Sequence, residues 1–270
     1  MQEQLMEQLK TGAIGLDKAK NIPMPPTFTD KQQERAYLKS RLAAAFRLFA
    51  LYGYDDGLAG HITARDPIEP DTFWVNPVGL HFSRIKASDL VRLDHDGNLV
   101  EGESLVNTAA FMIHSRIHAT YPLINAVAHS HSPAGRAWST QGRPLEPLTQ
   151  DSCVFFEKHD VLNVFEGVVH DQSEGETIAS KIGDDNIALI LQNHGLLTVG
   201  KDVDSAVSLY VQFENACATQ LRLEGAGSTQ LIPAEIARKT RQFTGSDLVV
   251  WGNFQPMYQV IESTQPDFME

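Results

Sequence analysis

The spacing of hydrophobic positions after residue 30 predicts an amphipathic helix near the start of the chain. Asp30 supplies a side chain that can cap the first turn of such a helix. Apolar side chains then fall on one helical face, at Leu38, Leu42, Ala45, Phe46 and Phe49. Gly53 is a natural helix stop, so we expect one long helix to end there.

Shorter apolar runs between residues 57 and 102 are typical of β-strands. They are "HITA", "TFWVN" and "LVRLD", with turn signals between them. Strand patterns return in "NAVAHSH" and "NIALILQ", and helices are predicted over residues 107–121, 173–182 and 202–224. A further helix is expected to begin at Ser132-Pro133, with the serine as N-cap. Because no regular βαβ repeat is present, the pattern predicts an α/β fold with a central sheet and helices on both faces.

The two ends of the chain differ from the stretch between them. Residues 1–28 are expected to form an extended N-terminal arm, because the prolines of "IPMPPTF" block a helix. Residues 29–250 form the expected domain. Residues 251–270 are expected to form an aromatic, irregular C-terminal tail. Its apolar side chains are expected to cover a pocket, a neighbouring subunit or their own domain.

Composition narrows the class of protein. The chain has 22 Lys and Arg against 34 Asp and Glu, which argues against nucleic acid or an anionic membrane as a partner. We see no apolar run long enough to span a bilayer and no apolar stretch of a secretory signal. Cys153 and Cys217 make no disulfide framework, which fits a reducing compartment. A globular, cytoplasmic protein is the expectation.

Three histidines in two separate motifs form the first candidate site. Residues two apart in a strand point to the same side, about 6.6 Å apart along the chain, so His129 and His131 of "AVAHSHSPAG" face one point. His194 of "LILQNHGLLTVG" follows another buried strand, where a side chain can be aimed into a cleft. Each histidine alone fits an ordinary core or turn role. The three together favour a metal site.

At this point the sequence resembles the class II aldolase/adducin family. "AVAHSHSPAG" and "NHGLLTVG" match its two histidine motifs, and "NTAAFMIHSRIHATYP" matches the helix before the first of them. The resemblance covers roughly residues 35–225. It implies a three-layer αβα sandwich around a mostly antiparallel sheet, and a homo-oligomer, commonly a tetramer, with sites at subunit interfaces. It also implies that His129, His131 and His194 hold a divalent metal, usually zinc.

The same resemblance indicates where a substrate binds. "GLAGHITARD" and "NPVGLHF" match the two substrate-pocket turns of the family, which assigns Gly60 and Gly79 to substrate binding. Asn107 opens the helix that contains His114 and is assigned to substrate binding together with these two glycines. His81, next to the second turn, is a weaker candidate of the same kind.

Several positions depart from the aldolase pattern. The aldolases carry an acid/base glutamate where this chain has Ala110, and an alanine can neither transfer a proton nor ligate a metal. They carry Gly-Asn where this chain has Gly60-His61, and a hydroxyl residue where Val78 stands. Because a phosphate needs several hydrogen-bond donors, these changes argue against a sugar-phosphate aldolase.

His61 is the candidate catalytic residue. Its imidazole can act as general acid/base in place of the missing glutamate, or bind a substrate carboxylate as a cation. The alternative is that His61 only bonds a neighbouring loop. His114 and His118, one helical turn apart, are expected to pack within their helix.

A three-histidine site leaves positions open for water and a chelating substrate, such as a 2-hydroxy or 2-keto acid or an ortho-hydroxy aromatic acid. The sequence therefore predicts first a metal-dependent lyase, either a retro-aldolase or a decarboxylase, acting on a non-phosphorylated carboxylate. Zinc is the expected metal, with manganese or iron(II) as alternatives. The second hypothesis is a non-haem iron(II) oxygenase. The third is an adducin-like binding scaffold, for which the actin cytoskeleton is the partner.

Overall fold

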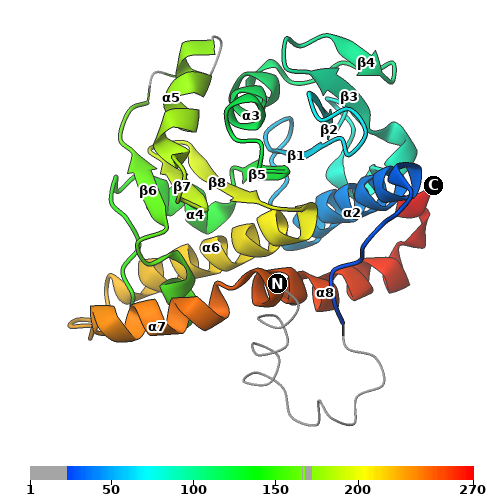
Figure 1. The fold of residues 1–270 in the computed structure, drawn as a ribbon. Coiled ribbons are helices and arrows are strands. Elements are labelled where there is room, and N and C mark those ends of the chain that lie inside the picture. Colours follow the sequence, from blue (N-terminus) through cyan, green and yellow to red (C-terminus); the bar gives the residue numbers. More distant parts are fainter. Residues whose placement is uncertain (1–22, 166, 168–171) are drawn as a thin grey trace, which may run out of the picture.

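A mixed sheet runs through the centre of the computed structural model, which describes residues 23–165, 167 and 172–270 (Figure 1). Its eight strands follow the order β4-β3-β2-β1-β5-β8-β7-β6. Neighbouring strands are antiparallel except for β6 and β7, which run parallel. The strands are β1 (His61–Arg65), β2 (Thr72–Val75), β3 (Val91–Asp94), β4 (Leu99–Glu101), β5 (Ala126–Ser130), β6 (His159–Leu162), β7 (Ala188–Leu191) and β8 (Gly195–Gly200).

Helices cover both faces of the sheet, which confirms the three-layer αβα sandwich (Figure 1). The α-helices are α2 (Lys31–Tyr52), α3 (Thr108–Thr120), α4 (Pro133–Ser139), α5 (Gln172–Ile182), α6 (Val203–Leu223), α7 (Ala234–Thr244) and α8 (Asp247–Thr264). The 3₁₀ helices are η1 (Phe82–Arg84), η2 (Ala87–Asp89), η3 (Asp151–Phe155) and η4 (Pro266–Met269). Within the described part of the chain, no helix is long and apolar enough to cross a bilayer.

Alternation along the strands decides which side chains face which layer. In β5, Ala126 and Ala128 pack into the core under α2 and α6, whereas Val127 packs into the core under α3 and α5. Since successive side chains of a strand point to opposite faces, His129 lies on the same side as Val127. The antiparallel register places His61 of β1 directly opposite His129. The α3 side of the sheet therefore carries the candidate site.

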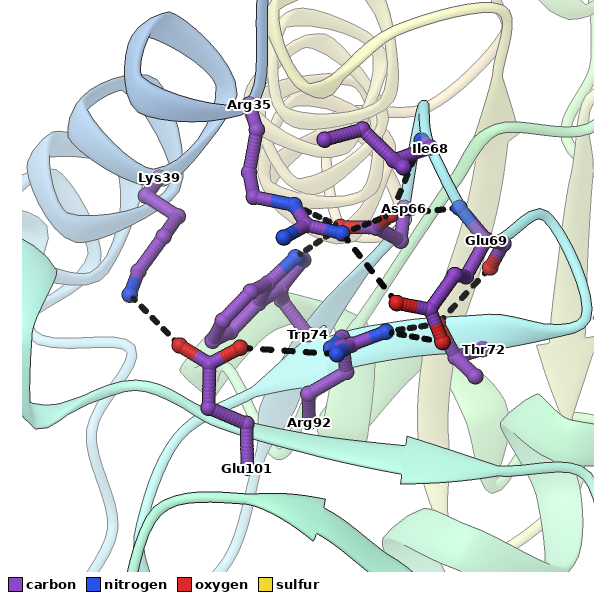
Figure 2. A network of polar contacts seen from close by, with 9 residues as sticks. All are labelled: Arg35, Lys39, Asp66, Ile68, Glu69, Thr72, Trp74, Arg92 and Glu101. Atoms are coloured by element: carbon purple, nitrogen blue, oxygen red, sulfur yellow. Dashed lines mark hydrogen bonds and ion pairs between the residues drawn. The ribbon is translucent and has the colours of Figure 1, made fainter. Parts of the chain in front are cut away.

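A buried charge network fixes α2 against the strands that carry this site (Figure 2). Asp66, just after β1, accepts two hydrogen bonds of 2.7 Å from Arg35 of α2 and one of 2.7 Å from the indole of Trp74. The ammonium group of Lys39 lies 4.0 Å from the centre of the Trp74 ring. Asp66 and Trp74 are both fully buried, so their pairing ties the first turns of α2 to β1 and β2.

The C-terminal segment differs from its expectation. The sequence predicted an irregular tail from residue 251, but α8 begins at Asp247 and includes Pro256 within it. Trp251 and Phe254 are both buried, and Phe254 belongs to the core shared with α2 and α6. Burial of these aromatic side chains outweighs the helix-breaking propensity of Pro256, as tertiary packing commonly does. Of the expected N-terminal arm, residues 1–22 lie outside the described residues.

Candidate metal centre

Three imidazoles converge at one end of β5 and β8. The ligand nitrogens of His129, His131 and His194 all lie within 4.8 Å of one another. The three ring centroids are 4.7 to 5.3 Å apart. Zinc–nitrogen bonds of about 2.0–2.1 Å place ligand nitrogens within about 4 Å of one another. A small movement of the three rings toward one another would therefore let the group hold one ion.

Backbone contacts aim two of these rings. The Nδ1 of His129 lies 2.8 Å from the carbonyl oxygen of Leu196 in β8. A carbonyl only accepts, so neutral His129 carries its proton on Nδ1 and leaves the Nε2 lone pair for a ligand. His194 lies in the turn between β7 and β8, after Asn193 in the left-handed region (φ 58°). A side chain at Gly195 would meet the Ser130 carbonyl at 2.7 Å, which explains the glycine of the Asn-His-Gly motif.

His131 is placed by the start of α4. The sequence predicted Ser132 as the side-chain cap of this helix, but its hydroxyl makes no cap bond. It donates instead to Glu214 of α6 at 2.5 Å. Glu214 itself accepts the free backbone N–H groups of Ala134 and Gly135 at 2.7 and 2.6 Å. A buried carboxylate from a distant helix therefore caps α4 and fixes the segment that carries His131.

Burial keeps the three histidines neutral. It lowers the pKa of His194 to about 4, with a further lowering by His131. It lowers the pKa of His129 well below its ordinary value, and neighbouring imidazoles add to this effect. The pKa of His131 is also lowered, first by burial and then by the nearby Arg136. Neutral imidazoles have free lone pairs, which is the state that a divalent metal requires.

The cluster opens into a pocket of about 390 Å³. Its apolar wall includes Leu58, Ile113 and Phe165. Among the described residues that line it, none is Asp or Glu. Position 110, where the aldolases have their glutamate, is an alanine in the first turn of α3. The carboxylate of Asp56 lies beside the pocket, where it pairs with the lining residue Arg136.

His61 lies between the cluster and α3. It lines the pocket, is 3% exposed, and its ring centroid is 4.9 Å from that of His129. Neither ring nitrogen has a hydrogen-bond partner among the described residues. Burial, followed by the neighbouring His114, lowers the pKa of His61 well below its ordinary value. A neutral His61 has a lone pair that can accept a hydrogen bond.

The predicted substrate residues separate into two groups. Gly60 and Asn107 line the pocket beside His61. Gly60 has φ of +90°, a backbone conformation that other residues rarely adopt, so a substitution there would be strained. Gly79 and His81 are not among the described lining residues. The side chain of His81 is 65% exposed and its Nε2 lies 3.0 Å from Asp55.

The structure adds residues that the sequence did not select. Arg136 of α4 lines the pocket and pairs with Asp56 at 2.6 Å. Asn193 and Phe165 also line it. Arg136 stands five residues after His131, and Asn193 directly precedes His194. Nearness to the histidine motifs was the signal that could have identified both.

Comparison with known proteins agrees with this geometry. "Decarboxylase NovR" of Streptomyces niveus is 44% identical over 90% of both chains. The "4-hydroxy-3-prenylphenylpyruvate oxygenase/4-hydroxy-3-prenylbenzoate synthase" of Streptomyces roseochromogenus subsp. oscitans is 44% identical over 90% of this chain and 88% of that one.

Among solved structures, the "L-fuculose 1-phosphate aldolase from Glaciozyma antarctica PI12" has a TM-score of 0.85 and 41% identity, covering 92% of this chain and 97% of the other. The family described as "Class II Aldolase and Adducin N-terminal domain" matches residues 40–221. With two-thirds of its length matched and both histidine motifs converging in space, the chain belongs to the class II aldolase and adducin family.

Proposed function

We propose that this protein is a metal-dependent enzyme that cleaves a carbon–carbon bond in a non-phosphorylated 2-keto or hydroxy acid, by decarboxylation, and that the substrate carries an aromatic group. The observation that carries the proposal is the composition of the pocket. Three neutral imidazoles converge there beside an arginine and an apolar wall, and its described lining contains no carboxylate.

The three histidines would hold the metal and leave positions open for substrate. A bound zinc, manganese or iron(II) ion would supply Lewis-acid polarisation of a substrate oxygen. Burial lowers the pKa of His129, His131 and His194, which favours the neutral state that a metal ligand requires. Because the three imidazoles are neutral, a bound ion would keep its full positive charge. Such an ion favours an anionic, chelating substrate.

Arg136 would orient the substrate carboxylate. Its guanidinium group is half exposed at the pocket and pairs with Asp56 at the surface. An exposed ion pair contributes little stability, so an incoming carboxylate can replace Asp56 in a bidentate contact. Leu58, Ile113 and Phe165 then offer an apolar wall to the rest of the substrate.

His61 would move the proton. As a buried neutral imidazole that faces the pocket, it can accept a proton from a substrate hydroxyl group and return that proton to the carbon left after cleavage. Ala110 cannot take this role, and the described lining holds no acidic side chain that could.

The names of two relatives favour an aromatic keto acid and add a second candidate. One is called a decarboxylase, and the other an oxygenase that acts on a phenylpyruvate. The second candidate for this chain is therefore an iron(II)-dependent oxidative decarboxylation at the same three histidines. Iron and a requirement for O₂ distinguish it from the lyase.

The test is metal content and CO₂ release in the same preparations. Protein purified anaerobically should carry near-stoichiometric metal and release CO₂ from 4-hydroxyphenylpyruvate or a related aromatic keto acid. His194→Ala should lose both, because two imidazoles remain. His81→Ala is the matched control and should keep both, since that side chain is exposed and outside the pocket. Parallel assays with and without O₂ separate lyase from oxygenase.

Two results would overturn the proposal. Folded protein that binds no zinc, manganese or iron(II) would favour the adducin-like scaffold, which actin co-sedimentation then tests. Cleavage of L-fuculose 1-phosphate, the substrate in the name of one solved relative, would show that a sugar-phosphate aldolase can work without the family glutamate.

We further propose a cytoplasmic homo-oligomer, with a tetramer as the expected state. Members of this family commonly oligomerise, and Leu58 and Phe165 at the pocket mouth are 64% and 50% exposed. Such exposed apolar side chains beside a site are suited to cover by a second subunit. Sedimentation equilibrium tests this directly, and a mass of 29.9 kDa, that of one chain, would contradict it.

A further inference from the structure

Three hydrogen-bonding side chains lie buried behind His61, on the side away from the metal cluster. Thr63 of β1 contacts two histidines of α3: its Oγ1 lies 2.8 Å from Nδ1 of His114 and 2.8 Å from Nε2 of His118. The Nδ1 of His118 lies 3.4 Å from the carbonyl oxygen of Ile124. Thr63, His114 and His118 are 0 to 1% exposed. The lyase proposal gives these groups no role.

The hydrogen bonds of this chain have only one consistent direction. The Ile124 carbonyl can only accept, so His118 carries its proton on Nδ1 and its Nε2 accepts from the Thr63 hydroxyl. Thr63 has a single proton, so it must accept from Nδ1–H of His114. The Nε2 of neutral His114 is then a bare acceptor. Burial supports the neutral forms, since it lowers the pKa of His118 to about 3 and that of His114 well below its ordinary value.

The ring of His114, at the acceptor end of these hydrogen bonds, packs against the ring of His61. The rings of His114 and His61 have centroids 4.4 Å apart. The Nε2 of His114 and both ring nitrogens of His61 are buried without a partner among the described residues. Leaving such groups unsatisfied costs about 1–3 kcal/mol each, which favours a hydrogen bond donated by His61 toward Nε2 of His114 through one bridging water.

We propose that His118, Thr63 and His114 are positioning residues that set the tautomer of His61, with its N–H toward His114 and its lone pair toward the pocket. This inference rests on the proposed function, in which His61 exchanges a proton with the substrate. A base needs its lone pair on the substrate side, and a fixed chain of hydrogen bonds supplies that state before substrate arrives.

The far end of the chain is itself held in place. The Nη2 of Arg65 in β1 donates to the carbonyl oxygens of both His118 and Ile124, at 2.6 and 3.1 Å. These are carbonyls at the C-terminal end of α3 and just beyond it, so the guanidinium group fixes the position of the Ile124 acceptor. The direction of these side-chain hydrogen bonds is therefore set by the Ile124 carbonyl.

Neutron crystallography of the zinc-loaded protein in D₂O tests the tautomers without any activity measurement. We expect deuterium on Nδ1 of His118, on the Thr63 hydroxyl and on Nδ1 of His114, with none on Nε2 of His114 or on the pocket-side nitrogen of His61. Thr63→Val keeps the shape and removes the hydroxyl, and should place deuterium on that pocket-side nitrogen in part of the molecules. Thr63→Ser keeps the hydroxyl and should match the wild type.

Two results would overturn the inference: deuterium on Nε2 of wild-type His114, or an identical His61 in the wild type and in Thr63→Val. Both are readable even if no substrate is found, so failure of the proposed function is a separate outcome. With a substrate in hand, loss of an outer hydrogen-bond partner typically costs about 10- to 100-fold in activity. That loss should appear in kcat of Thr63→Val with KM and zinc content unchanged, and Thr63→Ser should restore it.

Discussion

At the scale of single residues, burial decides what each histidine can do. His129 is almost completely buried and His194 is partly buried, and in both of them burial lowers the pKa of the ring. His61 is equally buried but has no partner for either nitrogen among the described residues. His81, by contrast, is exposed and pairs with Asp55. Identical side chains thus differ in burial and in hydrogen-bond partners through their surroundings.

Burial of neutral histidines predicts sensitivity to acid. An unfolded histidine titrates near 6.5, whereas the pKa of folded His118 is about 3. The unfolded chain therefore binds more protons below pH 6.5, and stability is lost as pH falls from 6.5 toward 3. At pH 4.5 this single group should cost about 3 kcal/mol.

Thermal unfolding of metal-free protein between pH 7.5 and 4.5 measures this cost. The variant His118→Gln should show a shallower fall of melting temperature with pH, whatever its stability at pH 7.5. The exposed control His81→Gln should follow the wild-type slope. Equal slopes in all three proteins would show that His118 does not stay neutral in the fold.

At the scale of elements, the site depends on helix ends capped from a distance. The first turn of α4 has its N–H groups bound by Glu214 of α6, and the end of α3 has its carbonyls bound by Arg65 of β1. Neither partner is local in the sequence. Both helices flank the group of three histidines. Contacts between charged side chains and the backbone of other elements therefore fix the position of the site.

Replacing the cap of α4 should loosen the cluster. In Glu214→Gln, an amide NH₂ must face N–H donors, so one acceptor is lost and stability should fall by about 2–3 kcal/mol. Zinc affinity, measured by competition with a chromophoric chelator, should fall with it because His131 precedes this turn. The matched control is Glu224→Gln, where α6 ends in an exposed pair with Arg143.

The control should change stability by at most about 1 kcal/mol. If both glutamine variants bind zinc as the wild type does, the cap at Glu214 contributes to folding alone.

At the scale of the whole molecule, α8 closes the fold over α2 and α6 (Figure 1). The guanidinium group of Arg41 in α2 makes two hydrogen bonds to Asp204 of α6, at 2.8 and 2.6 Å, and one to Gln255 of α8 at 2.9 Å. It also lies 3.6 Å from the centre of the Tyr258 ring. The buried guanidinium group of Arg41 thus joins α2, α6 and α8 on the side of the sheet opposite the three histidines.

Removing the main apolar contact of α8 should destabilise the whole domain. Phe254 is fully buried in the same core as α2 and α6, so Phe254→Ala should cost about 3–5 kcal/mol in urea unfolding. Val260→Ala on the same helix is the control, because that side chain is 46% exposed, and should change stability by about 0.5 kcal/mol or less. Equal costs would mean that α8 folds apart from the core.

The sequence by itself predicted many of the elements and the group of three histidines. Periodicity predicted α2 and α6, strand patterns predicted β1, β5 and β7, and the two histidine motifs identified His129, His131 and His194. These signals are local, because apolar spacing and turn chemistry act over a few residues.

Only the tertiary structure decided the rest. The pairing of His61 with His129 comes from the β1–β5 register, and the cap at Glu214 from the contact of α4 with α6. The place of Arg136 at the pocket and the helical state of α8 were likewise missed. Each depends on which distant segments lie together and on how much water they exclude. Burial and strand register are properties of the assembled chain, and no stretch of sequence carries them alone.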